Sequence, residues 1–274
     1  MTIDRRTLLR AAVGGAVAGA GELAGHHRSQ PRRTIYVAGD STAATYATAD
    51  VPRAGWGQAL PVFLRPGIGV VNEALSGASS KSFVDLGHLD RILTPIKPGD
   101  LLLISFGHND EKADDPARYT EPWTTFQTYL RLYLDGARSA GAHPVLVTPV
   151  ERRRFTAEGA AYQSHGEYPA AMRALAADTS TPLIDLTTLS LTLWSSLGPE
   201  RTKAYFLWLA AGESPNYPSG VSDNTHFQAH GAIEVARLVA SAGWMLPGRD
   251  HRALRDPSIA DGVLSWPSTR PAES

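Results

Sequence analysis

Short apolar runs alternate with longer amphipathic stretches along the chain. Five runs are predicted to be buried strands: residues 34–38, 69–72, 101–106, 144–148 and 182–185. Continuous β-branched or leucine-rich runs are typical of parallel strands that are covered on both faces. Apolar side chains at helical spacing over 126–137 and 232–239 predict amphipathic helices. Repeated alternation of strand and helix predicts a doubly wound α/β sheet with right-handed crossovers.

The first thirty residues have the pattern of an export signal. Residues 4–10 are basic, 11–24 are weakly apolar and rich in alanine and glycine, and small residues occupy 18–20. The adjacent Arg5 and Arg6 resemble a twin-arginine signal, which carries folded proteins across the bacterial membrane. We expect 1–30 to be a signal peptide and linker, and the protein to be secreted or extracytoplasmic in a bacterium. A basic amphipathic N-terminal helix is the alternative.

The remainder of the chain predicts one domain and a tail. Apolar runs continue to residue 246, so we expect the domain to span 31–246. From residue 247 to 274, proline, arginine and serine become frequent, which predicts an extended tail packed lightly or not at all.

The amino-acid composition excludes several classes of protein and of functional site. The 274 residues are 43% hydrophobic and 19% charged, which excludes wholesale disorder. The formal net charge of −1 argues against a general nucleic-acid-binding protein. The absence of cysteine excludes disulfides, thiolate metal sites and a thiol nucleophile. His26, His27 and His165 have no matching carboxylate cluster, so we predict no metal site.

Polar, glycine-containing segments follow three of the predicted strands. They are Gly-Asp-Ser at 39–41, a segment ending at Gly77, and Gly-His-Asn-Asp at 107–110. In a parallel sheet, such segments meet at the edge formed by the carboxyl ends of the strands. Asp223 and His226 occur together near the C-terminus, before the last predicted helix.

These residue types match the parts that an acyl-transfer site needs. Ser41, in a glycine turn at a strand end, is the expected nucleophile and His226 the general base. Asp223, three residues earlier, is expected to orient the imidazole from one short turn. The expected oxyanion donors are the backbone N–H groups of Ser41 and Gly77 and the side-chain amide of Asn109.

Taken singly, each of these residues has an ordinary structural explanation. Ser41 could cap a turn, Asn109 could stabilise a loop, and His226 could be the first residue of a helix. Their joint occurrence in this order favours the catalytic interpretation.

Together these segments resemble the four sequence blocks of the SGNH (GDSL-type) hydrolases. Within them, 37–42, 55–57, 71–74, 106–110 and 148–155 are most similar to rhamnogalacturonan acetylesterases. The resemblance implies a three-layer α/β/α flavodoxin-like sandwich with a five-stranded parallel sheet and no cofactor. It also implies removal of O-acetyl groups from a pectic polysaccharide, with Ser41, Gly77, Asn109, Asp223 and His226 in the roles given above. Ala78 departs from the family, which often has arginine there, and this leaves the exact substrate open.

Further residues are candidates for substrate binding. Arg152, Arg153 and Arg154 follow the fourth predicted strand, and arginine binds carboxylates through paired N–H groups. The alternative is a solvated loop that contacts no substrate. His108 is expected to line the cleft or to brace its loop.

The same predicted triad and oxyanion donors are compatible with other functions. The alternatives are an esterase that acts on acetylated xylan or another glycan, and a general lipase or acyl thioesterase of this superfamily. No Gly-x-Ser-x-Gly motif occurs, which argues against an α/β-hydrolase. A secreted glycan-binding module is the non-enzyme alternative, although it would be expected to lack a member of the triad. We expect an acetylated polysaccharide or oligosaccharide as substrate and no nucleic acid or membrane partner.

Overall fold

A computed structural model of the chain describes residues 33–64, 67–242 and 264–269. All of them belong to one of the two compact units of the chain, residues 32–274. The predicted signal peptide and linker, up to residue 30, lie outside the described residues.

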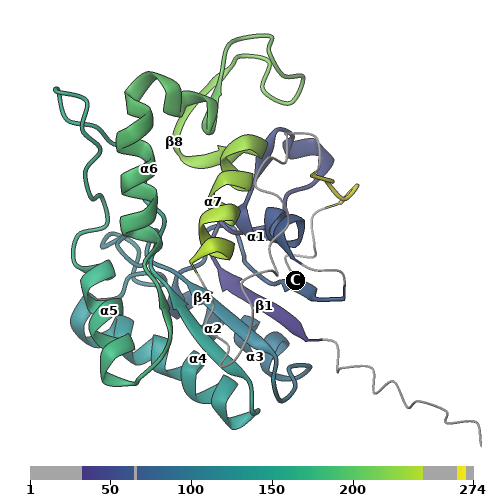
Figure 1. Cartoon of the computed structure of the whole chain (residues 1–274), viewed down its shortest axis with the longest axis vertical. Helices are drawn as coiled ribbons and strands as arrows, with labels where there is room; N and C mark the ends of the chain where they lie inside the picture. The colour runs from purple at the N-terminus through teal and green to yellow at the C-terminus, as the bar shows by residue number, and fades with distance from the viewer. Residues whose placement is uncertain (1–32, 65–66, 243–263, 270–274) are drawn as a thin grey trace, which may run out of the picture. The chain divides into compact units, whose positions relative to one another are not determined.

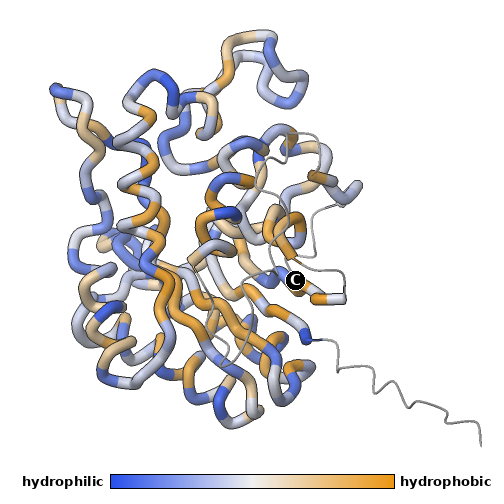
Figure 2. Tube along the Cα trace, viewed as in Figure 1, coloured by the Kyte–Doolittle hydropathy of each residue, from blue (hydrophilic) through white to orange (hydrophobic). Residues whose placement is uncertain are grey.

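Five parallel strands form the central sheet, as the sequence predicts. Their order is β3-β1-β4-β5-β6, the order of the flavodoxin-like doubly wound fold. The strands are β1 (Thr34–Gly39), β3 (Gly69–Asn72), β4 (Leu101–Ser105), β5 (His143–Val147) and β6 (Leu183–Ile184). This confirms the predicted fold class and all five predicted strands. Figure 2 shows the hydrophobic colour concentrated along these central strands.

Alternating side chains of the strands enter two separate hydrophobic cores. On β1, Ile35 and Val37 belong to one core, and Tyr36 and Ala38 belong to the other. Successive side chains of a strand point to opposite faces, so the sheet is buried on both sides. This explains why its strands are continuous apolar runs rather than alternating ones.

Helices cover both faces of the sheet. Buried side chains of α1 (Trp56–Ala59), α6 (Leu186–Arg201) and α7 (Ala229–Ser241) pack in the first core. Those of α2 (Ser80–Asp85), α3 (His88–Leu93), α4 (Gln127–Ser139) and α5 (Tyr168–Asp178) pack in the second. Figure 1 shows α6 and α7 together in the upper part of the view and α2, α3 and α4 together in the lower part.

Shorter helical turns complete the connections. They are η1 (Thr48–Asp50), η2 (Leu60–Phe63), the π-helical turn η3 (Pro122–Phe126) and η4 (Thr202–Ala204). None of the helices in the described part of the chain has the length and apolar character that a membrane span requires.

A second, smaller sheet is antiparallel and is not predicted from the sequence. It has the order β2-β8-β7, formed by β2 (Arg53–Ala54), β7 (Phe206–Leu209) and β8 (Val221–Gln228). Strand β8 contains the Asp-Asn-Thr-His segment, so this sheet positions two of the predicted site residues.

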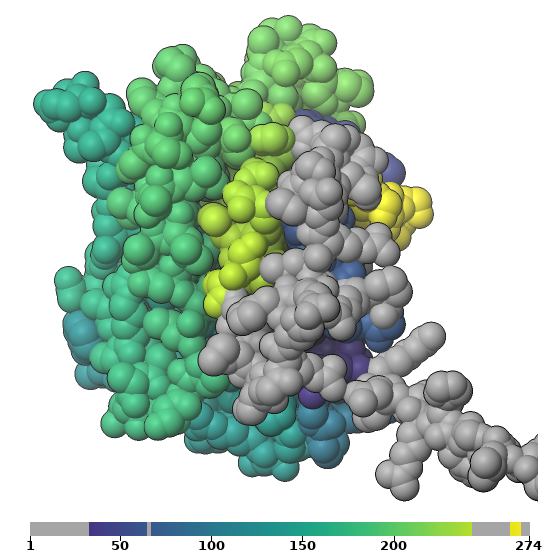
Figure 3. Space-filling model, in the orientation of Figure 1, coloured from purple at the N-terminus to yellow at the C-terminus, as the bar shows by residue number. Residues whose placement is uncertain are grey.

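Part of the C-terminal tail packs against the domain. The Trp266 indole donates a hydrogen bond to the Arg53 carbonyl at 2.9 Å, and Leu264 is buried in the first core. The Thr48 N–H donates to the Pro267 carbonyl at 2.9 Å. Residues 264–269, shown in yellow in Figure 3, thus contact the domain mainly through the side chains of Leu264 and Trp266, and their other four residues are exposed. This is the light packing that the sequence predicts, and the rest of the predicted tail lies outside the described residues.

Candidate active site

A tight turn after β1 holds Ser41. The buried Asp40 carboxylate accepts hydrogen bonds from the Thr42 N–H at 2.8 Å and the Thr42 hydroxyl at 2.7 Å. The Tyr46 hydroxyl donates to the Ser41 carbonyl at 2.8 Å. Side chains on both sides of the serine therefore fix its backbone, and only 7% of the residue is exposed.

Ser41, His226 and Asp223 form one hydrogen-bonded chain. The Ser41 hydroxyl lies 2.9 Å from His226 Nε2, and His226 Nδ1 lies 2.7 Å from Asp223 Oδ2. An ionised carboxylate only accepts hydrogen bonds, so His226 carries its proton on Nδ1. Nε2 is then free to accept the serine proton. The structure brings together all three residues that the sequence proposes for the triad.

The local backbone of β8 delivers Asp223 and His226 side by side. Asp223 Oδ1 accepts the N–H of Thr225 at 2.7 Å and that of His226 at 3.0 Å. These bonds fold the segment back on the aspartate, while Phe227 is paired with β2 and β7. The short turn expected from the sequence is thus an irregular part of a strand.

Hydrogen bonds keep Asp223 ionised. Burial raises the pKa of this carboxyl, but the hydrogen bond and charge attraction from His226 and the two backbone N–H groups outweigh burial and lower the pKa to about 2. At neutral pH the carboxylate therefore stabilises positive charge on the imidazole.

The predicted oxyanion donors lie in segments joined to the serine turn. The Leu75 N–H donates to the Gly39 carbonyl at 3.0 Å, and Asn109 Nδ2 donates to the Ala78 carbonyl at 2.9 Å. Gly77 has a φ of +83°, which favours glycine. Among the described residues, the N–H groups of Ser41 and Gly77 donate no hydrogen bond, and Asn109 Nδ2 retains a second hydrogen.

His108 is buried beneath the serine turn rather than exposed to a substrate. It is 3% exposed, and its Nδ1 lies 3.2 Å from Asp40 Oδ2. Burial, together with smaller repulsion from His165 and Arg152, lowers the pKa of His108 to about 4. Of the two roles expected for His108, these contacts favour bracing over substrate binding: a neutral His108 donates to Asp40 and holds the turn.

Two of the three loop arginines bind the protein itself. Arg152 forms an ion pair with Glu111 and lies 3.2 Å from His165 Nδ1. Arg153 donates to Asn224 Oδ1 at 3.0 Å, and its guanidinium stacks 4.6 Å from the centre of the Trp208 ring. We therefore correct the assignment of both to substrate binding, because these contacts engage their guanidinium groups. Arg154 is exposed, and its side chain has no partner among the described residues.

Other features lie apart from this site. Within the described ranges, no three His, Asp or Glu side chains are grouped so as to hold a metal ion.

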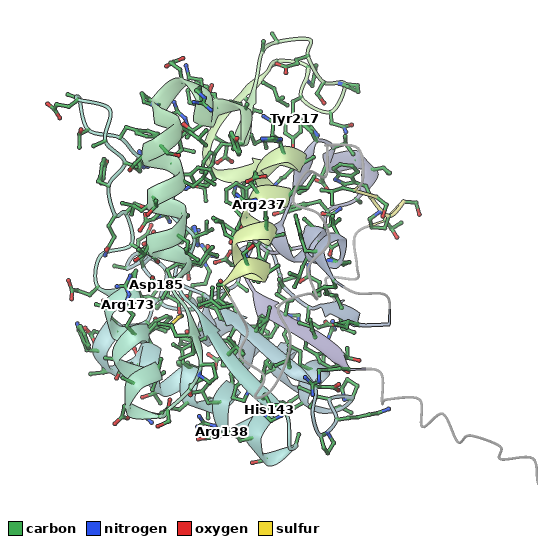
Figure 4. All side chains as sticks on the ribbon, viewed as in Figure 1. Arg138, His143, Arg173, Asp185, Tyr217 and Arg237 are labelled. Carbon is green, nitrogen blue, oxygen red and sulfur yellow. The ribbon has the colours of Figure 1, made fainter. Side chains whose placement is uncertain are left out.

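A hollow of about 470 Å³ is lined by Gln163, Thr187, Thr188, Leu191, Thr192 and Ser195, none of which belongs to the candidate site. Near it, Arg173 of α5 and Asp185 point toward each other in Figure 4, 2.9 Å apart.

The chain is similar to known esterases over most of its length. Residues 37–232 match the model of the GDSL-like lipase/acylhydrolase family. Rhamnogalacturonan acetylesterase RhgT of Bacillus subtilis strain 168 is 46% identical over 224 residues, which are 81% of this chain and 95% of the relative. Probable rhamnogalacturonan acetylesterase YesY of the same strain is 43% identical over 75% of this chain and 90% of its own.

One solved structure is similar to this chain in both fold and sequence. The crystal structure of the YxiM protein of B. subtilis has a TM-score of 0.65 and 35% sequence identity, and the match covers 76% of this chain and 55% of that one. The chain belongs to the GDSL-like lipase/acylhydrolase family, as the sequence blocks predict. It is accordingly a carboxylic ester hydrolase.

The buried His108 predicts loss of stability in mild acid. In the unfolded chain the imidazole takes up a proton near its ordinary pKa of 6.5, whereas the folded chain resists protonation until about pH 4. Because the unfolded state binds more protons between these values, the free energy of unfolding falls by up to roughly 3 kcal/mol as pH drops from 6.5 to 4. His108→Asn keeps a donor for Asp40 without the titration, so it is expected to flatten this part of the profile.

Urea unfolding at intervals between pH 7 and 4 measures this effect. The control is His143→Asn, which removes an exposed imidazole at the start of β5 (Figure 4) and is expected to keep the wild-type slope. A His108→Asn profile as steep as that of the wild type would show that His108 does not cause the loss of stability.

Proposed function

We propose that this chain is a serine esterase that removes O-acetyl groups from rhamnogalacturonan. The single observation that carries the proposal is the relay of 2.9 and 2.7 Å from Ser41 through His226 to Asp223. A serine hydroxyl is a weak nucleophile unless an oriented base accepts its proton. This arrangement supplies the base and the carboxylate that orients it.

Catalysis proceeds through an acetyl-serine. Ser41 Oγ attacks the acetyl carbonyl carbon while its proton moves to His226 Nε2, and the carbonyl oxygen becomes an oxyanion. The N–H groups of Ser41 and Gly77 and the Asn109 amide stabilise that charge. When the intermediate collapses, His226 returns the proton to the departing sugar oxygen. Water then attacks the acetyl-serine by the same route and releases acetate, so the reaction needs no cofactor.

The proposed substrate follows from the relatives. RhgT is named a rhamnogalacturonan acetylesterase and YesY a probable one. The matches to this chain cover 95% of RhgT and 90% of YesY. This supports an acetylated pectic polysaccharide over a neutral glycan such as acetylated xylan.

Acetate release tests this proposal. We expect the wild type to release acetate from acetylated rhamnogalacturonan faster than from acetylated xylan, and Ser41→Ala to lower the rate by about 10⁴-fold or more. Release from xylan alone would overturn the substrate and keep the mechanism. Release from neither polymer, with the protein folded, would favour a small-ester hydrolase or a glycan-binding module.

We also propose that the protein is exported from a bacterial cell, because its polymeric substrate lies outside. Arg5 and Arg6 and the apolar stretch that follows support this proposal. Cell fractionation tests it: replacement of both arginines by lysine is expected to leave the esterase in the cytoplasm. A wild-type enzyme that itself stays in the cytoplasm would contradict export.

A further inference from the structure

A cationic side chain lies beside the glycine of the proposed oxyanion site. A Cβ atom built on Gly77 would lie 3.9 Å from Arg118 Nη1, and apart from the residues on either side no other heavy atom of the described residues would lie within 4 Å of it. Arg118 comes from the long connection between β4 and η3, about forty residues further along the chain. The guanidinium group of Arg118 is therefore the nearest described side-chain group to this face of Gly77.

An ion pair orients this guanidinium. Arg118 Nε donates to Asp115 Oδ2 at 2.5 Å, and about a third of each side chain is exposed. Among the described residues, no acceptor binds the two terminal nitrogens of Arg118. Asp115 thus holds the arginine by its inner nitrogen, and the outer pair of N–H groups stays available. This edge of a guanidinium binds a carboxylate through two parallel hydrogen bonds.

The loop that carries Arg118 is fastened at both ends. Its first residue follows Asp110, whose buried carboxylate accepts the Ser80 N–H at 3.1 Å and the Thr120 hydroxyl at 3.0 Å. The Thr120 N–H donates to the Asp110 carbonyl at 3.0 Å, and the Tyr168 hydroxyl donates to the same carbonyl at 2.8 Å. Because the ends are joined, the arginine is positioned before any ligand arrives, which lowers the entropic cost of binding.

A second cation belongs to the same loop. Lys112 follows Asn109 by one turn, with its N–H donating to the Asn109 carbonyl at 3.3 Å. Burial, and then repulsion from Arg118 and Arg152, lowers the pKa of Lys112, so these cations lie within electrostatic reach of one another. No side chain of the described residues forms an ion pair with the Lys112 amino group.

Net charge does not set this loop apart. Glu111, Asp114 and Asp115 lie on it as well, so its three acidic groups outnumber Lys112 and Arg118, and Glu111 is already paired with Arg152. What distinguishes the loop is the position of its arginine, whose Nη1 lies 3.9 Å from the place of a Cβ on Gly77. Recognition there depends on hydrogen bonds of fixed geometry, which select a planar carboxylate.

We propose that Arg118, assisted by Lys112, binds the carboxylate of an acidic sugar next to the acetyl ester and thereby directs the enzyme to uronate-containing chains. This inference rests on the proposed function, since it requires the ester carbonyl to be bound at Ser41 and Gly77. Arg118 is a specificity-determining residue in this proposal and takes no part in the chemical steps.

Three substrates test the proposal on four proteins. The substrates are acetylated rhamnogalacturonan, the same polymer with its carboxylates methyl-esterified, and p-nitrophenyl acetate. The proteins are the wild type, Arg118→Gln, Lys112→Gln and the control Lys97→Gln. Lys97 has an exposed side chain four residues before β4 and so lies at the opposite edge of the sheet.

Arg118→Gln is expected to lower kcat/KM on the acidic polymer by about tenfold to a hundredfold, mostly through KM, because hydrogen bonds to a charged group are lost. The expected loss in Lys112→Gln is smaller, and Lys97→Gln is expected to match the wild type. On the methyl-esterified polymer and on p-nitrophenyl acetate all four proteins are expected to be equal. Arg118→Lys, which keeps the charge without the fork, is expected to be intermediate on the acidic polymer.

Equal losses on all three substrates would overturn the proposal, because they would show that Arg118 only supports the Gly77 loop. Unchanged kinetics in Arg118→Gln would overturn it as well. If Arg118→Gln does not fold, the comparison of Arg118→Lys with the wild type on the acidic and methyl-esterified polymers decides between the same outcomes. Failure of the proposed function differs from these results: the wild type itself would release no acetate from either polymer while it hydrolyses p-nitrophenyl acetate.

Discussion

The parallel pairing of β1 with both β3 and β4 is the constraint on which the site depends. Val37 is in register with Asn72, and Gly39 with Ser105, so the three strands end at nearly the same level. The chain then turns at each end and presents polar groups at one edge of the sheet. Side chains buried on both faces keep this register, because a shift would move apolar residues between the two cores. The nucleophile and the oxyanion donors are thus positioned by packing far from the reacting atoms.

A second, antiparallel sheet supplies the other half of the relay. Strand β8 is held between β2 and β7, and the Asp223 carboxylate folds the polar part of the strand around itself. His226 therefore meets Ser41 from an element that shares no strand with the central sheet. Beneath the serine, Asp40 has a comparable role: it accepts from Thr42 on one side and from His108 on the other. Two aspartates, one buried and one half-buried, thus fix the two partners of the proton transfer.

Much of this arrangement is predictable from the sequence, and the reasons are local. Five apolar runs identify the central sheet, and polar glycine-containing segments at their ends identify Ser41, Gly77 and Asn109. The small sheet escapes prediction because β2 has two residues and the middle of β8 is polar, without the alternation typical of a strand. The sequence also does not reveal which distant residues a side chain will contact in the folded protein. Glu111 and Asn224 bind Arg152 and Arg153, and no sequence pattern joins Arg118 to Gly77.

Asp223 and His226 are expected to activate Ser41, and the rate of covalent labelling of the serine measures that activation. The wild type and Asp223→Asn are treated with a fluorophosphonate, and the modified peptide and the rate of labelling are determined by mass spectrometry. We expect a single adduct on Ser41, formed up to about 10⁴-fold more slowly in Asp223→Asn because the imidazole then takes the wrong tautomer. An adduct on another serine, or labelling of Asp223→Asn at the wild-type rate, would contradict this expectation.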